Sequence, residues 1–169
     1  MKKSAALFAL NLFVTLSSLL LGGLDAEAKD LTHRLGVGYA NNFNIDLPSV
    51  SARYYSSEDL GFSTSLGVNT EDNDNKFGFG LKMYKVIFPE EHMNFYMGAG
   101  TALLSTKISG VSSSGFELNA YCGGEFFIPG LDSLGISFEA GVGIVSMSSG
   151  VSFRTIADTP LSAGMIFYF

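Results

Sequence analysis

The sequence predicts an all-β fold, an eight-stranded antiparallel up-and-down β-barrel that spans a membrane and follows a cleaved signal peptide. Three observations lead to this prediction. Apolar residues alternate with glycine, serine and charged residues along most of the chain, which is the period of a strand with two different environments. Residues 1–28 have the layout of a secretory signal peptide. The connections between the alternating segments are alternately short and long, as in transmembrane barrels.

The amino-terminal segment supports export from the cytoplasm. Lys2-Lys3 is a basic start, an apolar run extends from Ala5 to Leu21, and Ala26-Glu27-Ala28 has the small residues of a cleavage site. A retained membrane anchor is the alternative, but the fully apolar core of this run is short. We therefore expect cleavage after Ala28 and a mature chain of residues 29–169 that forms a single barrel domain.

The first half of the expected barrel contains four alternating segments. They are about 32–40, 47–56, 60–69 and 76–88. In the third segment, for example, Phe62 and Leu66 share one face, and Gly61 and Ser65 share the other. The segments are close to the ~9–11 residues that a tilted membrane strand needs.

The second half continues the alternation to the end of the chain. Its segments are about 94–106, 115–128, 134–147 and 161–169. In the last one, Met165, Phe167 and Phe169 lie on one face and Tyr168 lies on the other. An even number of strands places both ends of the barrel on the same side of the membrane.

The lengths of the connections indicate which side that is. The links after the second, fourth and sixth segments are short, at 57–59, 89–93 and 129–133. The links after the first, third, fifth and seventh are generally longer and more polar, at 41–46, 70–75, 107–114 and 148–160. Transmembrane barrels have short periplasmic turns and longer outer loops, so we expect both termini in the periplasm.

The charged residues in the middle of the segments, together with Arg34, lie on the face of glycine and serine. They are Arg34, Arg53, Lys82, Glu117, Glu125 and Glu139. A basic residue facing lipid at the midplane would cost about 2–4 kcal/mol, so this face is expected to be the interior. Buried charges need partners, and we expect the three cations to pair with the three glutamates as a plug. A polar path or gate for a small solute is the alternative, because the many interior glycines suit either arrangement.

A soluble barrel or sandwich would carry the same alternation with the apolar face inward. The terminal phenylalanine, the alternating loop lengths and the aromatic residues near the expected periplasmic ends favour the membrane barrel. On these features the mature chain resembles the small eight-stranded outer-membrane barrels, the group of the OmpA transmembrane domain, OmpX and OmpW. The resemblance covers residues 29–169 and is most specific at Ala163–Phe169.

The resemblance implies a place in the outer membrane of a Gram-negative bacterium. It also implies insertion by the β-barrel assembly machinery, with Met165, Phe167, Tyr168 and Phe169 as the insertion signal. Proteins of this group are structural or adhesive surface proteins, porin-like narrow channels or, occasionally, lipid-modifying enzymes. The resemblance does not choose among these roles.

The sequence contains no pattern that favours catalysis. His33 and His92 are expected near the periplasmic rim, away from any serine and carboxylate that would complete a hydrolytic triad. The acidic run Glu71–Asn75 begins like a calcium loop but lacks its glycine and its closing glutamate. We therefore expect no catalytic residue, no metal and no cofactor.

The expected partners follow from the class of protein. They are outer-membrane lipid and the assembly machinery, for a chain that is a monomer. The net charge of −6 and the absence of a basic stretch argue against nucleic acid. The expected role is structural or surface-interacting, and the sequence does not identify an extracellular ligand. A narrow channel for small or hydrophobic solutes is the alternative, and a lipid-modifying enzyme is a more remote one.

Overall fold

The computed structural model describes residues 29–72, 74–148, 150–157 and 161–169, and the expected signal peptide lies outside the described residues. The described residues form β-strands and connections. The strands are β1 (Leu35–Ala40), β2 (Ser49–Tyr55), β3 (Leu60–Glu71), β4 (Asp74–Glu90), β5 (Met93–Ile108), β6 (Val111–Phe127), β7 (Leu134–Met147), β8 (Gly150–Thr155) and β9 (Ser162–Tyr168). No helix long and apolar enough to cross a membrane is found among them.

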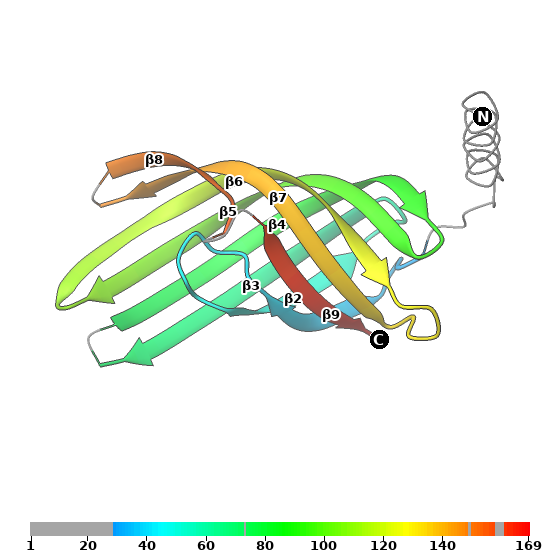
Figure 1. The fold of residues 1–169 in the computed structure, drawn as a ribbon, viewed down its shortest axis with the longest axis horizontal. Coiled ribbons are helices and arrows are strands. Elements are labelled where there is room, and N and C mark those ends of the chain that lie inside the picture. Colours follow the sequence, from blue (N-terminus) through cyan, green and yellow to red (C-terminus); the bar gives the residue numbers. More distant parts are fainter. Residues whose placement is uncertain (1–28, 73, 149, 158–160) are drawn as a thin grey trace, which may run out of the picture.

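Eight of these strands close into the expected antiparallel barrel (Figure 1). From β1 to β7 each strand pairs with the next one along the chain. The ring is completed by β9, which pairs with β1 through Gly36 and Tyr168 and with β7 through Glu139 and Ser162. The predicted fold class is therefore confirmed, and β7 has the same bounds that the sequence predicts.

The connection 148–160, expected as one long loop, contains a strand. β8 pairs with residues 142–147 of β7, whereas β9 pairs with residues 134–139 of the same strand. Without β8, the outer half of β7 would present a free edge of unpaired backbone groups. The prediction of a loop is therefore wrong for residues 150–155, where Val151, Phe153 and Thr155 alternate with smaller or charged residues and the backbone pairs with β7.

The expected loops 70–75 and 107–114 are also mostly strand. β3 and β4 stay paired up to Glu71 and Asp74, and β5 and β6 up to Ile108 and Val111. The second hairpin closes on Ser109-Gly110, both with positive φ (50° and 83°), which suits the right-handed twist of the strands. These segments carry polar residues on both faces, so the sequence predicted loops. A hairpin that projects beyond the apolar part of the barrel can be exposed to water on both faces and still be a sheet. Figure 1 shows these two hairpins, together with the β7–β8 pair, extending past β1, β2 and β9.

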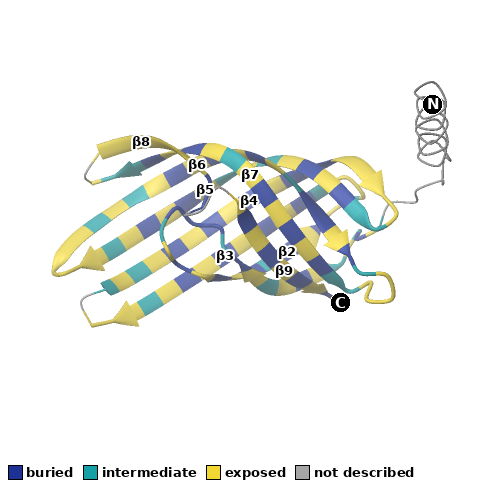
Figure 2. Cartoon of the chain, in the orientation of Figure 1, coloured by how far each residue is buried: buried dark blue, intermediate teal, exposed yellow. Residues whose placement is uncertain are grey.

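The apolar face of the barrel points outward. In β9, Met165 is 52% exposed and Phe167 is 53% exposed, whereas Ile166 and Tyr168 are fully buried. The same alternation of exposed and buried residues runs along the strands of the closed part of the barrel, whereas β8 is exposed throughout (Figure 2). A soluble barrel would show the opposite arrangement, with charges outside and the apolar face within.

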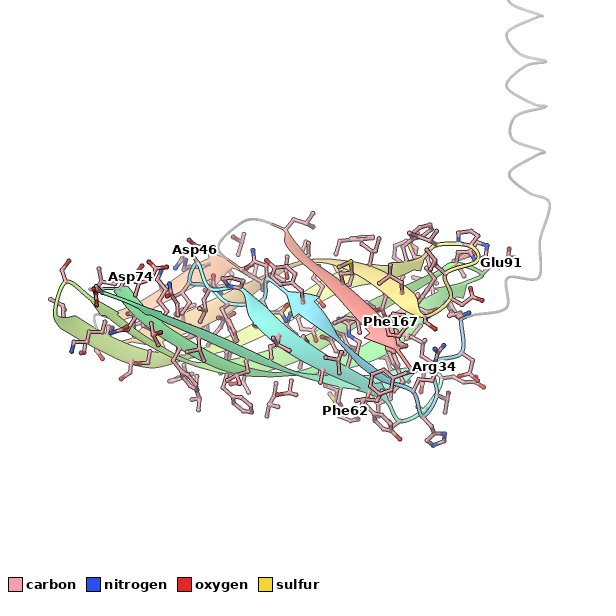
Figure 3. All side chains as sticks on the ribbon, turned by 90° about the horizontal axis from the view of Figure 1, so that it is seen from below. Arg34, Asp46, Phe62, Asp74, Glu91 and Phe167 are labelled. Carbon is pink, nitrogen blue, oxygen red and sulfur yellow. The ribbon has the colours of Figure 1, made fainter. Side chains whose placement is uncertain are left out.

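Two clusters fill the interior. The cluster nearer the termini is rich in tyrosine and includes Tyr55, Tyr84, Tyr96, Tyr121 and Tyr168. The second cluster lies toward the projecting hairpins and includes Phe43, Leu47, Ala102, Leu104 and Val145. We call the two ends of the barrel the terminal end and the hairpin end. Figure 3 labels Arg34 and Glu91 at the terminal end and Asp46 and Asp74 at the hairpin end.

Candidate functional site

Four of the six charged residues predicted for the interior meet at its centre. Arg53 of β2 lies between two carboxylates, with Nη1 3.1 Å from Glu125 Oε2 and Nη2 3.6 Å from Glu139 Oε1. Lys82 of β4 forms an ion pair with the second oxygen of Glu139. All four side chains are at least nine-tenths buried. The cluster joins β2, β4, β6 and β7 across the barrel.

Small residues on the neighbouring strands make room for these long side chains. Arg53 is flanked in register by Gly36 and Ser63, Lys82 by Ser63 and Gly100, and Glu139 by Gly123 and Ser162. Because directly opposite residues have Cβ atoms only about 5 Å apart, a large neighbour would block the reach across the barrel. The glycine and serine of the inner face therefore position the charges.

Buried tyrosines complete the hydrogen bonding of the carboxylates. Tyr55 and Tyr168 donate to the two oxygens of Glu125 at 3.2 Å and 2.8 Å, and Tyr96 donates to Glu139 Oε1 at 3.0 Å. Every carboxylate oxygen of Glu125 and Glu139 thus has a partner. Removing one member of a buried ion pair costs about 3–5 kcal/mol of stability, because the charge of the other member stays buried.

The cations also lie against tyrosine rings. The guanidinium carbon of Arg53 is 4.4 Å from the ring centroid of Tyr84 and 5.6 Å from that of Tyr96. The ammonium of Lys82 is 4.7 Å from the ring centroid of Tyr121. Each such contact is favourable by about 2 kcal/mol when it is desolvated. We call the four charged residues and the five tyrosines of the interior the central network.

Tyr55, Tyr84, Tyr96 and Tyr121 were not among the residues singled out from the sequence, and Tyr168 was expected only as part of the insertion signal. Their signal was present, since Tyr84, Tyr96 and Tyr121 occupy positions of the glycine, serine and charged face. An aromatic residue with a hydroxyl group on an inner face that also carries buried carboxylates is a candidate hydrogen-bond donor.

Arg34 and Glu117 lie apart from the central network. The guanidinium of Arg34 is at the terminal end, where it donates to Ser133 Oγ at 3.1 Å and to the carbonyl of Tyr168 at 3.0 Å. Glu117 is fully buried toward the hairpin end, where its Oε1 accepts a bond from Asn119 Nδ2 at 2.8 Å. The alternation in the sequence identifies the face on which a residue lies, but not its position along the barrel axis. Glu117 and Glu125 share a face of β6 about 26 Å apart along the strand.

The residues of the expected insertion signal divide between the two faces. Met165, Phe167 and Phe169 point outward, and Tyr168 points inward to Glu125. The carboxyl-terminal strand therefore presents an aromatic stripe on the outside and contributes a hydroxyl to the central network.

An exposed ion pair lies on the outward face at the terminal end. Asp59, in the turn between β2 and β3, pairs with Lys85 of β4. Hydrogen bonds from Lys85 and Ser57, together with the charge of Lys85, lower the pKa of Asp59 below its usual value. Lys85 is thus a charge on the apolar face, close to the end of the barrel and neutralised by its partner.

Comparison with known proteins finds a likeness in fold. No protein-family model matches the chain, and no curated protein matches it. The structure is similar to the crystal structure of the N-terminal β-barrel domain of Pseudomonas aeruginosa OprF, with a TM-score of 0.58 and 13% sequence identity. The similarity covers 82% of this chain and 98% of the OprF domain. At this identity the likeness shows the fold alone.

Proposed function

We propose that the protein is a monomeric bacterial outer-membrane β-barrel with a structural or surface-interaction role and a closed polar interior. The observation that carries the proposal is the inverted polarity of the barrel. Phenylalanine, leucine and methionine are exposed around the outside, while arginine, lysine and glutamate are buried inside. Lipid is the surrounding that accepts such a surface, since soluble proteins rarely expose large contiguous apolar patches.

The height of the apolar outer face fits a bilayer. On β6 this face extends without a charge from Phe116 to Phe126, and the next outward residue toward the hairpin end is Ser114. The stretch is about 33 Å along the strand, or about 25 Å along the barrel axis at a ~40° tilt. This matches the apolar band of known membrane barrels.

The central network supports a structural role over a channel. Its carboxylates are paired with Arg53 and Lys82 and bonded to buried tyrosines, so the interior charges hold opposite walls together. A non-catalytic role is supported by the positions of the histidines. His33 is exposed ahead of β1, and His92 is in the turn before β5 with Glu91 3.7 Å away.

The same proposal covers the partners of the chain. The outward stripe of Met165, Phe167 and Phe169 is accessible to lipid and to an assembly machinery that reads the last strand. Tyr168 would be read by its backbone, because its side chain is inside the barrel.

Three measurements test the proposal. The protein purified in detergent should migrate differently on gels before and after heating. In cell fractions, the protein should stay with the membrane after extraction with carbonate. An unshifted band together with recovery in a soluble periplasmic extract would reject the membrane barrel. In planar bilayers we expect no discrete conductance steps. Steps that Glu139→Ala abolishes would favour the alternative, a narrow channel.

A further inference from the structure

The connection between β1 and β2 folds into the barrel. The two strands are paired up to Ala40 and Ser49, so a tight turn would be enough to join them. Instead the chain makes a longer excursion through residues 41–48, which we call the inner loop. Asn42, Phe43, Asn44 and Leu47 of this loop are 9%, 1%, 2% and 1% exposed, respectively. An exposed surface connection would not bury four side chains.

The inner loop covers the side of the barrel where the wall is low. β9, β1 and β2 are 7, 6 and 7 residues long, while β4, β5 and β6 on the opposite side have 17, 16 and 17 residues. Because β9, β1 and β2 are short, no strand encloses the interior at the hairpin end on this side, next to β3. The inner loop fills this space from within, and Figure 3 labels its Asp46 at that end.

Glycines of the tall wall receive the apolar residues of the inner loop. A Cβ atom at Gly78 would lie 2.8 Å from the ring of Phe43, and one at Gly67 would lie 2.8 Å from Leu47. Both distances are shorter than a van der Waals contact, so larger residues at these positions would push the loop out. The wall and the loop are therefore complementary in shape.

One polar side chain connects the inner loop to the central network. Asn42 donates to Ser65 Oγ at 2.9 Å, and its Oδ1 accepts from the ammonium of Lys82 at 2.9 Å and from Ser162 Oγ at 3.3 Å. Lys82 also pairs with Glu139 in the central network. Asn42 is thus a latch, because its amide holds three strands of the wall at once.

Other polar groups oppose the closed position. The amide of Asn44 is buried, and neither its nitrogen nor its oxygen has a hydrogen-bond partner. Glu117 Oε2 is also buried without a partner, and no cation lies within ion-pair distance of this carboxylate in the part of the chain that the structure describes. In register, Glu117 lies between Ala102 and Val145, which pack with Phe43 and Leu47. Water would satisfy both groups if the loop moved away.

We propose that the inner loop is a displaceable seal over a vestibule at the hairpin end, and that Glu117 makes this vestibule selective for small cations. The hydrogen bonds of Asn42 and the fit of Phe43 and Leu47 against glycines of the wall hold the seal closed. The amide of Asn44 and Oε2 of Glu117, which have no hydrogen-bond partner, favour its release. Once the seal is displaced, the vestibule presents the carboxylate of Glu117, which has no basic side chain within ion-pair distance among the described residues. The inference goes beyond the structural role proposed above, because it gives the interior a state that solutes can enter.

The test measures how fast a thiol under the seal reacts with water-soluble reagents. The protein carries Cys122→Ser and Ala102→Cys, which places the thiol beside Glu117 and under Phe43 and Leu47 of the inner loop. The probes are a cationic and an anionic methanethiosulfonate of similar size. Only the heat-shifted, folded fraction is analysed. A failure of the barrel fold therefore appears as a missing shift, separate from a failure of this inference.

We expect slow labelling with the latch intact. Asn42→Ala should accelerate labelling roughly tenfold to a hundredfold, which is the effect on an equilibrium of losing a hydrogen bond to a charged group. The matched control is Asn75→Ala on the exposed part of β4, which should leave the rate unchanged. Labelling as fast as in urea-unfolded protein, or an unchanged rate in Asn42→Ala, would overturn the seal.

The charge of the vestibule is tested in the Asn42→Ala background. The cationic reagent should react several-fold faster than the anionic one, and Glu117→Gln should remove this preference without slowing both reagents. Equal rates for the two reagents before the glutamate is changed, or a preference that persists in Glu117→Gln, would overturn the assignment of cation selectivity to Glu117.

Discussion

Replacing Arg53 by methionine tests the central network most directly. Arg53→Met keeps the length of the side chain and removes its charge, so that Glu125 loses the cation that lies 3.1 Å from its carboxylate. Glu139 keeps its ion pair with Lys82. The change therefore leaves one fully buried carboxylate with tyrosine hydroxyls as its remaining partners.

The expected loss follows from this geometry. Removing one partner of a buried ion pair costs about 3–5 kcal/mol. The loss of the cation–π contact with the ring of Tyr84 also destabilises the folded protein, and its free energy is partly included in this cost. A small domain has about 5–15 kcal/mol of unfolding free energy, so Arg53→Met should remove a large fraction of it. Adding Glu125→Gln should recover part of the loss, because the orphaned charge is then absent.

The assay is reversible urea unfolding in detergent or vesicles, followed by the fraction of heat-shifted protein. A double-mutant cycle with Arg53→Met and Glu125→Gln gives the coupling free energy between the two residues. Lys85→Met is the control, since it removes a cation of similar length from the exposed pair with Asp59. A loss for Arg53→Met no larger than for Lys85→Met, or strictly additive effects in the cycle, would refute the reasoning.

Three further predictions use other parts of the barrel. Ala120→Arg, in the middle of the outward face of β6, should destabilise the barrel in vesicles by about 2–4 kcal/mol; an unchanged urea midpoint would contradict a lipid-facing wall. Because Lys85 lowers the pKa of Asp59 in the folded state, the contribution of this pair to stability is present above the unfolded-state pKa and is lost as the pH falls through the folded-state value. An NMR titration should show the Asp59 midpoint moving upward in Lys85→Met, and an unmoved midpoint would contradict the pairing. Deleting Phe169 should reduce the amount of protein assembled in the outer membrane while leaving the urea midpoint of refolded protein nearly unchanged, and normal assembly would exclude the terminal aromatic as an insertion signal.

Patterns within a single strand were readable from the sequence. The alternation of Phe167 and Tyr168 is a property of neighbouring residues, because successive side chains of a strand point to opposite faces. It placed one outside and the other inside, as the structure has them. The same reasoning assigned Arg53 and Glu139 to the interior, where both are buried.

Tertiary structure decided everything that depends on height or on pairing between strands. Residues 107–114 have the polar composition of a loop, yet they form a hairpin because each strand supplies the other with backbone partners. The sequence placed Glu117 and Glu125 on one inner face, but only the register of β6 against its neighbours puts Glu125 beside Arg53 and leaves Glu117 under the inner loop. The course of that loop was likewise hidden, since the notch for Phe43 is formed by glycines of a strand far along the chain. The face on which a residue lies depends only on the two-residue repeat of its own strand. Contacts across a closed barrel depend on the stagger of all its strands.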